Sequence, residues 1–207
     1  MFTLEGLDKS GKWSQAEKLY TRLMAEGYKV VKSEHHRYDT PTGQLIMDWL
    51  TRKYDVDQRT IELIMTADKQ AQQSWYQQLE QDGVEVLILD RYMLSQLAYS
   101  KAAGVDLEWS LQLQKYMRKS DIDFVIDIPP DESMRRKGKH NNGVNDKYES
   151  DYKLLSNVQN NYIHLPIEHT SKEKYIVNGM QTIEEIHDEI YSIVKIHLED
   201  YEKENRN

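Results

Sequence analysis

The chain alternates between short apolar runs and longer segments in which apolar residues recur every three or four positions. The short runs are typical of buried parallel strands, and the longer segments are typical of helices with one apolar face. We predict strands at residues 1–4, 28–32, 84–89, 123–128 and 174–177. We predict helices at residues 16–26, 43–53, 57–82, 93–103, 107–120 and 181–203, a short helix from Asp131 and another over 146–162.

The regular alternation of strands and helices predicts an α/β fold, with a doubly wound, five-stranded parallel sheet and flanking helices. No internal repeat or low-complexity segment divides the 207 residues, so we expect a single domain over residues 1–207. Within it, residues 135–147 begin with a basic, glycine-containing sequence without hydrophobic period. We predict that this insertion is a lid that closes over phosphates and excludes water, with an exposed loop of no such role as the alternative.

Residues 5–15, with the sequence EGLDKSGKWSQ, lie between the first predicted strand and the first predicted helix. Gly6, Gly11 and Lys12 have the spacing of the phosphate-binding motif G-x-x-x-x-G-K. Glycine lets backbone N–H groups converge on a polyphosphate, and the helix N-terminus behind them attracts the anion. An ordinary turn before a helix is the alternative. The predicted ATP phosphate site comprises residues of this loop and one arginine of the lid: Gly6, Lys9, Ser10, Gly11, Lys12, Trp13, Ser14 and Arg135.

The residue after Lys12 departs from the motif. It should be Ser or Thr, whose hydroxyl binds Mg²⁺, but it is Trp13, and Ser14 follows one place later. Asp90 ends the predicted central strand and is our candidate metal ligand, directly or through water, because Mg²⁺ keeps several waters and is bound mainly by ATP oxygens. Arg91 beside it can bind a second phosphate. A helix-capping aspartate next to a surface arginine is the alternative.

The segment 35–43 is a polar loop after the second predicted strand. Its adjacent histidines, His35 and His36, suggest metal at first sight. They lack a partner at helical spacing and a nearby carboxylate cluster, so we expect solvated loop residues instead. Arg37 follows the carboxyl end of a strand, where α/β sheets bind ligands, although a surface arginine is as good an interpretation.

Composition narrows the partners and the compartment that we expect. The net charge of −8 argues against a general nucleic-acid binder, which would be basic. The absence of cysteine excludes a disulfide framework, a thiolate metal site and a cysteine nucleophile. The N-terminus resembles no signal peptide, and no apolar run approaches the roughly 20 residues that span a bilayer. We therefore expect a cytoplasmic protein without membrane contact.

With these features in this order, the chain resembles the nucleoside monophosphate kinases of the P-loop class, and within them the thymidylate kinases. The resemblance runs from Leu4 to about Tyr162. Its motifs are LEGLD at residues 4–8, DRYxxSxxAY at residues 90–99 and DKYE at residues 146–149. The sequence TADK at residues 66–69 is similar to a family segment that usually ends in arginine.

The resemblance implies roles for residues at matching positions. Asp8 resembles the carboxylate that recognises the sugar 3′-hydroxyl, and Arg91 resembles the arginine that binds the acceptor phosphate. Lys69 stands where the family's arginine contacts the pyrimidine O4, and Met65 stands where an aromatic ring usually stacks on the base. Ser95, Gln96 and Tyr99 resemble the residues that form the wall near the base. Tyr148 resembles an aromatic residue beside the lid, and Arg37 lies one place away from the position of a loop arginine. The implied nucleoside monophosphate site is Asp8, Arg37, Met65, Lys69, Arg91, Ser95, Gln96, Tyr99 and Tyr148.

Two sources of positive charge could stabilise the transferring group. Lys9 lies where one branch of the family has a catalytic arginine, whereas another branch places its arginines in the lid, as Arg135 and Arg136 are here. The sequence leaves open which of them acts. The implied catalytic residues are Lys12, Lys9, Arg91 and Arg136.

The resemblance implies transfer of the γ-phosphoryl group from ATP to dTMP, with Mg²⁺ as cofactor, by a homodimer. Met65 and Lys69 alter the base pocket, so a kinase for another, 5-modified deoxynucleoside monophosphate is an alternative. A nucleotide-binding homologue with weakened catalysis is a second alternative, favoured by Trp13. A nucleic-acid end kinase fits poorly with an acidic chain.

Overall fold

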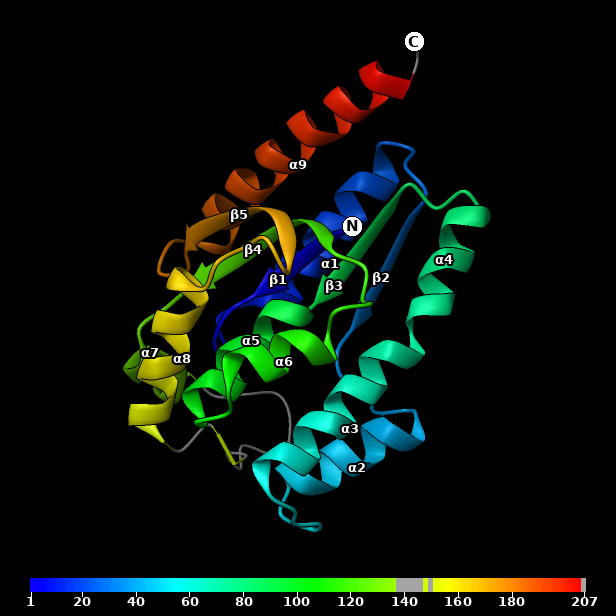
Figure 1. Cartoon of the computed structure of the whole chain (residues 1–207). Helices are drawn as coiled ribbons and strands as arrows, with labels where there is room; N and C mark the ends of the chain where they lie inside the picture. The colour runs from blue at the N-terminus through cyan, green and yellow to red at the C-terminus, as the bar shows by residue number, and fades with distance from the viewer. Residues whose placement is uncertain (137–146, 149–150, 206–207) are drawn as a thin grey trace.

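The structure is a computed structural model that describes residues 1–136, 147–148 and 151–205 (Figure 1). Its strands form one parallel sheet in the order β2-β3-β1-β4-β5, which confirms the predicted fold class. The central strand β1 pairs with β3 on one side and with β4 on the other. The strands are β1 (Phe2–Glu5), β2 (Val30–Glu34), β3 (Val86–Asp90), β4 (Ser120–Asp127) and β5 (Ser171–Asn178).

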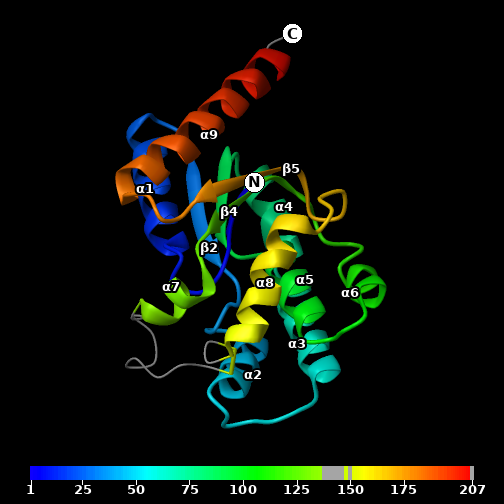
Figure 2. The same ribbon diagram turned by 90° about the vertical axis from the view of Figure 1, so that its left-hand side faces the viewer.

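Helices cover both faces of the sheet and its carboxyl edge (Figures 1 and 2). Helices α1 and α9 pack together on one face, and α5 and α8 pack together on the other. Helices α2 and α3 lie side by side beyond the carboxyl edge. The described helices are α1 (Lys12–Ala25), α2 (Pro41–Leu50), α3 (Gln58–Ala71), α4 (Gln73–Gln81), α5 (Met93–Ala102), α6 (Leu107–Leu113), α7 (Pro130–Arg135), α8 (Tyr152–His164) and α9 (Ile183–Asn205).

Separate apolar clusters hold the two faces in place. Leu19 and Leu23 of α1 meet Ile190 and Val194 of α9 over the inner strands, where all four side chains are buried. On the other face, leucines and valines of α5 and α8 pack against β4. Burial of each such side chain contributes about 1.5–3 kcal/mol, so the sheet edge that carries the polar loops is rigidly supported.

Several predicted boundaries were wrong. The helix predicted over 57–82 is divided at Gln72, whose N–H bonds to Lys69 three residues back, in a tighter turn than an α-helix makes. The helix predicted over 107–120 ends at Leu113, because Ser120 already belongs to β4 and its N–H bonds to the carbonyl of Thr170.

The second strand and the eighth helix also start later than predicted. Strand β2 begins at Val30 rather than at residue 28, and α8 begins at Tyr152, where Asp151 caps the N–H of Leu154. Asp146, Glu149 and the central part of the predicted lid, residues 137–146, lie outside the described residues. Among the described residues, no helix is long and apolar enough to cross a membrane.

Gly43 lies where the first turn of α2 meets the preceding loop. A Cβ atom there would lie 1.8 Å from the carbonyl oxygen of Arg37. Glycine-to-alanine exchange inside a helix normally stabilises by roughly 0.5–1 kcal/mol. We predict the opposite sign for Gly43→Ala, a loss of about 2 to 3 kcal/mol in the free energy of unfolding, because backbone must move to make room.

Chemical denaturation measures this loss. The matched control is Gly83→Ala, where a Cβ would meet nothing within 4 Å and the cost is the strain of a φ of 73°, of order 1 kcal/mol. A Gly43→Ala protein as stable as the unaltered chain would contradict the prediction.

Candidate active site

The phosphate-binding loop connects β1 to α1 at the carboxyl edge of the sheet. Gly6 has a φ of 131°, and a Cβ atom on it would lie 2.5 Å from the carbonyl oxygen of Ile126 in β4. Gly11 caps α1 with a φ of 102°, and Lys9 also adopts a left-handed conformation. These conformations curl the loop in front of the first turn of α1, whose N–H groups have no partner within the helix. The loop therefore forms a cradle suited to an anion.

Lys12 is buried inside this loop, where its Nζ donates to the carbonyl oxygen of Leu7 over 2.7 Å. Burial, together with the charge of Arg91, lowers the pKa of Lys12 to about 8. Ser10 lies beside it, and its buried Oγ has no hydrogen-bond partner among the described residues. An arriving phosphate would supply an acceptor to both side chains.

Trp13 points away from the cradle, because its side chain is 49% exposed and the Nζ of Lys32 lies 5.2 Å from its ring centroid. Asp90 ends β3 beside β1, and its charge acts on the Lys12 ammonium. Within the described residues, no group of three His, Asp or Glu side chains could hold a metal ion. Asp90 is thus a single candidate carboxylate ligand, which suits Mg²⁺ because this ion is bound mainly by nucleotide oxygens and water.

Four of the implied nucleotide-binding residues meet directly in front of the loop. Arg91 donates from one nitrogen to Asp8 over 2.5 Å, and from another to Ser95 over 3.2 Å and to Tyr162 over 3.0 Å. Tyr99 donates to the other carboxylate oxygen of Asp8 over 3.1 Å. Burial opposes ionisation of Asp8, but the charges of Arg91 and Lys12 outweigh it and lower the pKa of Asp8 to about 2. Arg91 has a φ of 66°, the kind of strained backbone that often occurs at functional sites.

A cavity that is partly open to solvent lies beside this cluster. Eight of the nine implied nucleoside monophosphate residues line it: Asp8, Met65, Lys69, Arg91, Ser95, Gln96, Tyr99 and Tyr148. The ring of Tyr148 packs between Trp49 and Tyr99, with centroid distances of 5.4 and 5.0 Å. These eight residues come from four separate parts of the chain and form one pocket.

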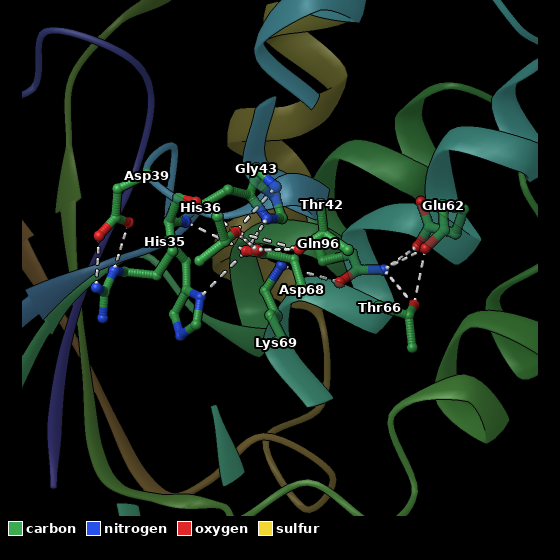
Figure 3. Close-up of polar contacts among 12 residues, drawn as sticks. His35, His36, Asp39, Thr42, Gly43, Glu62, Thr66, Asp68, Lys69 and Gln96 are labelled. Carbon is green, nitrogen blue, oxygen red and sulfur yellow. Dashed lines mark hydrogen bonds and ion pairs between the residues drawn. The ribbon is translucent and has the colours of Figure 1, made fainter. Parts of the chain in front are cut away.

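The far end of the cavity carries a hydrogen-bonded chain of side chains (Figure 3). Lys69 donates to the carbonyl oxygen of Gln96 over 3.0 Å, and the Gln96 amide donates to Glu62 over 2.8 Å. Ser100 donates to the other oxygen of Glu62. This end can offer both a donor and acceptors to a heterocycle.

The histidines are not solvated loop residues, so that prediction was wrong. His35 is buried and its Nε2 lies 2.5 Å from the Tyr76 hydroxyl, while the Nδ1 of His36 lies 3.0 Å from Asp68. Burial lowers the pKa of His35 to about 4 and that of His36 to about 3, so both are neutral at physiological pH. They line the cavity because Asp68 of α3 binds the loop that carries them (Figure 3).

The remaining predicted arginines lie in different surroundings. Arg37 does not line the cavity and instead binds Asp39 through two hydrogen bonds of 3.0 and 2.8 Å. Arg135 binds Glu132 on the outer side of α7, with a side chain 73% exposed. Arg136 does reach the phosphate-binding loop, where it donates to the carbonyl oxygen of Lys9 over 3.2 Å.

Several residues of the site escaped the sequence reasoning. Glu5, Glu62 and Ser100 were given no role, although a glutamate inside an apolar strand, as Glu5 is, could have signalled a buried charge. Tyr92 and Tyr162 also border the site. Glu62 lies on an amphipathic helix, where no sequence pattern separates a buried carboxylate from a solvated one.

A phosphate cradle at the carboxyl edge of a parallel sheet, facing an arginine-containing pocket, defines a P-loop nucleotide kinase. The family model described as thymidylate kinase matches residues 4–190. The chain therefore belongs to the thymidylate kinase family of nucleoside monophosphate kinases.

Relatives agree with this assignment. A protein of Pyrococcus abyssi described as "Probable thymidylate kinase" is 33% identical over 94% of this chain and 95% of its own length. One of Thermococcus kodakarensis with the same description is 30% identical over 93% and 95%. A solved thymidylate kinase structure from Candida albicans shares the fold, with a TM-score of 0.81 and 23% identity, over 95% of this chain and 91% of its own.

The buried carboxylate of Glu5 gives a prediction about stability and pH. Burial, reinforced by Asp123, raises the pKa of Glu5 to about 8, although Ser95 donates a hydrogen bond to it. The folded chain therefore binds a proton that the unfolded chain releases between pH 4.5 and 8, so this group makes stability fall as pH rises through that window. Glu5→Gln removes the loss, and we expect it to stabilise the protein by about 2 to 4 kcal/mol at pH 8.5.

Urea denaturation of both proteins between pH 5 and 8.5 measures the difference. The gain should shrink toward zero near pH 5, where glutamate and glutamine are both neutral in the folded state. Taking the difference between the two proteins cancels most of the contribution of His35 and His36, which acts in the opposite direction below pH 6.5. A pH-independent difference would show that Glu5 does not titrate in this range.

Proposed function

We propose that the chain transfers the γ-phosphoryl group of ATP to dTMP, giving dTDP and ADP, in the cleft between the phosphate-binding loop and the cavity. The observation that carries the assignment of this site is the contact of Arg91 with Asp8, because it brings an acceptor-phosphate cation to within reach of the Lys12 cradle. The family membership supports the reaction itself.

On the donor side, the loop amides and Lys12 hold the ATP phosphates, with Ser10 as a further donor. Asp90 would hold Mg²⁺, directly or through water, and the bound ion would supply positive charge at the nucleotide oxygens. Arg136 and Lys9 add positive charge where the transferring group carries negative charge. Arg135 would have to leave Glu132 to join them.

On the acceptor side, the dTMP phosphate competes with Asp8 for Arg91, because it carries more negative charge than one carboxylate. Asp8 is then free to accept a hydrogen bond from the sugar 3′-hydroxyl, with Tyr99 beside it. An acceptor phosphate oxygen bonds to the γ-phosphorus while the bond to the bridging β–γ oxygen breaks and ADP leaves. Charge and alignment do most of the work, so the site needs no strong general base.

Three further expectations rest on resemblance and composition. The family resemblance supports a homodimer and a cytoplasmic location, and the net charge of −8 argues against nucleic acid as a partner.

Residues 135–147 are proposed as the lid, with Arg136 contacting Lys9 at one end and Tyr148 contacting the cavity just past the other.

Lys12→Ala tests the donor site. We expect turnover to fall by roughly 10²-fold or more, the scale of losing one electrostatic stabiliser of a transition state. ADP release in a coupled assay with ATP and dTMP measures it, and Lys18→Ala, an exposed lysine that pairs with Glu184 on the outer side of α1, is the control. Near-normal turnover of Lys12→Ala would place Lys12 away from the phosphates. No dTMP-dependent ADP release from the unaltered chain would favour a nucleotide-binding homologue without catalysis.

The composition of the base pocket predicts a broadened preference. Met65 is adaptable, and Lys69 makes single contacts rather than the paired contacts of an arginine. We expect kcat/KM for dUMP and for 5-substituted dUMP to lie within about tenfold of that for dTMP, less than the largest discrimination that one methyl group can give. Steady-state kinetics with the three nucleotides decide this, and a strict preference for dTMP would contradict the prediction.

A further inference from the structure

Lys69 places an ammonium group in an almost dry position. Its side chain belongs to α3, is 1% exposed and lines the far end of the cavity. A buried lysine tends to lose its proton, because burial penalises the charged form, whereas an arginine in the same position would stay charged. Burial indeed lowers the pKa of Lys69 to about 8. An opposite charge nearby therefore decides how far above neutral pH this lysine stays charged.

Glu62 is linked to Lys69 by hydrogen bonds through the side chain of Gln96 (Figure 3). The carboxylate is completely buried, about two turns before Lys69 on the same helix. The Gln96 amide stands between them, with its oxygen accepting from Lys69 over 3.0 Å and its nitrogen donating to Glu62 over 2.8 Å. Lysine can only donate and an ionised carboxylate can only accept, so both ends impose the same orientation on the amide.

The hydrogen bonds around Gln96 leave little freedom in this chain. Its amide nitrogen also contacts the hydroxyl of Thr66 at 2.9 Å, and Ser100 donates to the second oxygen of Glu62. Lysine carries three N–H donors, and the bond to Gln96 occupies one of them. The remaining donors of Lys69 can serve a ligand in the cavity.

Other charged groups face Lys69 but are engaged elsewhere. Asp68 accepts hydrogen bonds from His36, from the N–H of Arg37 and from the hydroxyls of Thr40 and Thr42. The pKa of Glu5, from β1, is raised to about 8 by burial, so at neutral pH this group is largely uncharged. Arg91 lies on the acceptor-phosphate side and disfavours the charge on Lys69. The charge of Lys69 also helps to lower the pKa values of His35 and His36, which are neutral at physiological pH.

We propose that Glu62 is a positioning residue that, through the Gln96 amide, keeps Lys69 charged and directed at a carbonyl oxygen of the nucleobase. This rests on the proposed function, in which the base of the acceptor nucleotide occupies this end of the cavity. A 4-oxo pyrimidine presents an acceptor to Lys69, whereas the 4-amino group of cytosine presents a donor. Glu62 thereby sets the preference for 4-oxo over 4-amino bases, although it never touches the substrate.

The test compares dTMP binding at different pH values in the unaltered chain and in Glu62→Gln, by titration calorimetry without ATP. The substitution removes the charge and keeps the size; the amide oxygen can still accept from Gln96, while the amide nitrogen can donate to the Ser100 hydroxyl. We expect the pH at which dTMP binding weakens to fall by about one unit, since an opposite charge nearby shifts a pKa by about 1–3 units. At pH 8 the Kd for dTMP should rise about fivefold, while at pH 6.5 it should change less than about threefold. The Kd for dCMP should change little at either pH.

Two variants separate this role from a merely structural one. In Lys69→Arg the cation cannot lose its proton, so between pH 6.5 and 9 dTMP binding should weaken less than in the unaltered chain, with only the titration of groups such as Lys12 and Glu5 remaining. Adding Glu62→Gln should then cost less than about threefold at every pH. Ser100→Ala removes a hydrogen bond to Glu62 but not its charge, and should leave the midpoint in place. Circular dichroism establishes that each variant is folded, and ratios to the unaltered chain cancel the titration of the nucleotide.

The outcomes that overturn the inference are distinct. If Glu62→Gln weakens dTMP binding by the same factor at every pH, or if Lys69→Arg keeps the pH dependence of the unaltered chain, Glu62 does not act through the charge of Lys69. If the unaltered chain binds no dTMP at any pH, the proposed function fails and this inference fails with it. Binding of dTMP with a midpoint that Glu62→Gln does not move overturns this inference alone.

Discussion

The contact between Arg91 and Asp8 is the interaction on which the site depends. Both groups lie at the carboxyl edge of the sheet, where β1 and β3 end side by side and apolar helices exclude much of the water. Separating this half-buried pair would leave an uncompensated charge with less water around it than at the surface, which costs free energy. The ion pair therefore holds the strained backbone of Arg91 against the curled loop that carries Asp8.

The same constraint explains the rest of the cleft. Lys12, Lys69, Glu5 and Glu62 are all buried, and each has a partner or an altered protonation state that makes burial tolerable. The pKa values of the two lysines fall and those of the two glutamates rise, in the directions that reduce buried charge. The cleft is thus close to electrically balanced before any nucleotide arrives. A nucleotide that binds here must therefore replace hydrogen-bond and ion-pair partners that these side chains already have within the protein.

The fold could be read from the sequence because its signals are local. An apolar run such as residues 84–89 can hardly be anything but a buried strand, and the glycine spacing of residues 6–12 fixes a loop before a helix. Boundaries failed where a distant partner decides, as at Ser120, which joins β4 because Thr170 lies next to it. Eight of nine implied acceptor-site residues line one cavity, because motif positions carry spatial information that composition lacks. The two histidines were misjudged because their burial depends on α3 meeting the loop after β2, and Glu62 was missed because its burial depends on α3 meeting α5.

Tyr148 and Arg136 contact different parts of the site. Its ring is held between Trp49 and Tyr99, and its hydroxyl accepts a hydrogen bond from Gln58 over 3.0 Å. At the other side of residues 137–146, Arg136 is tied to the backbone of the phosphate-binding loop. Two residues that lie close together in the sequence, Arg136 and Tyr148, therefore contact opposite sides of the proposed site.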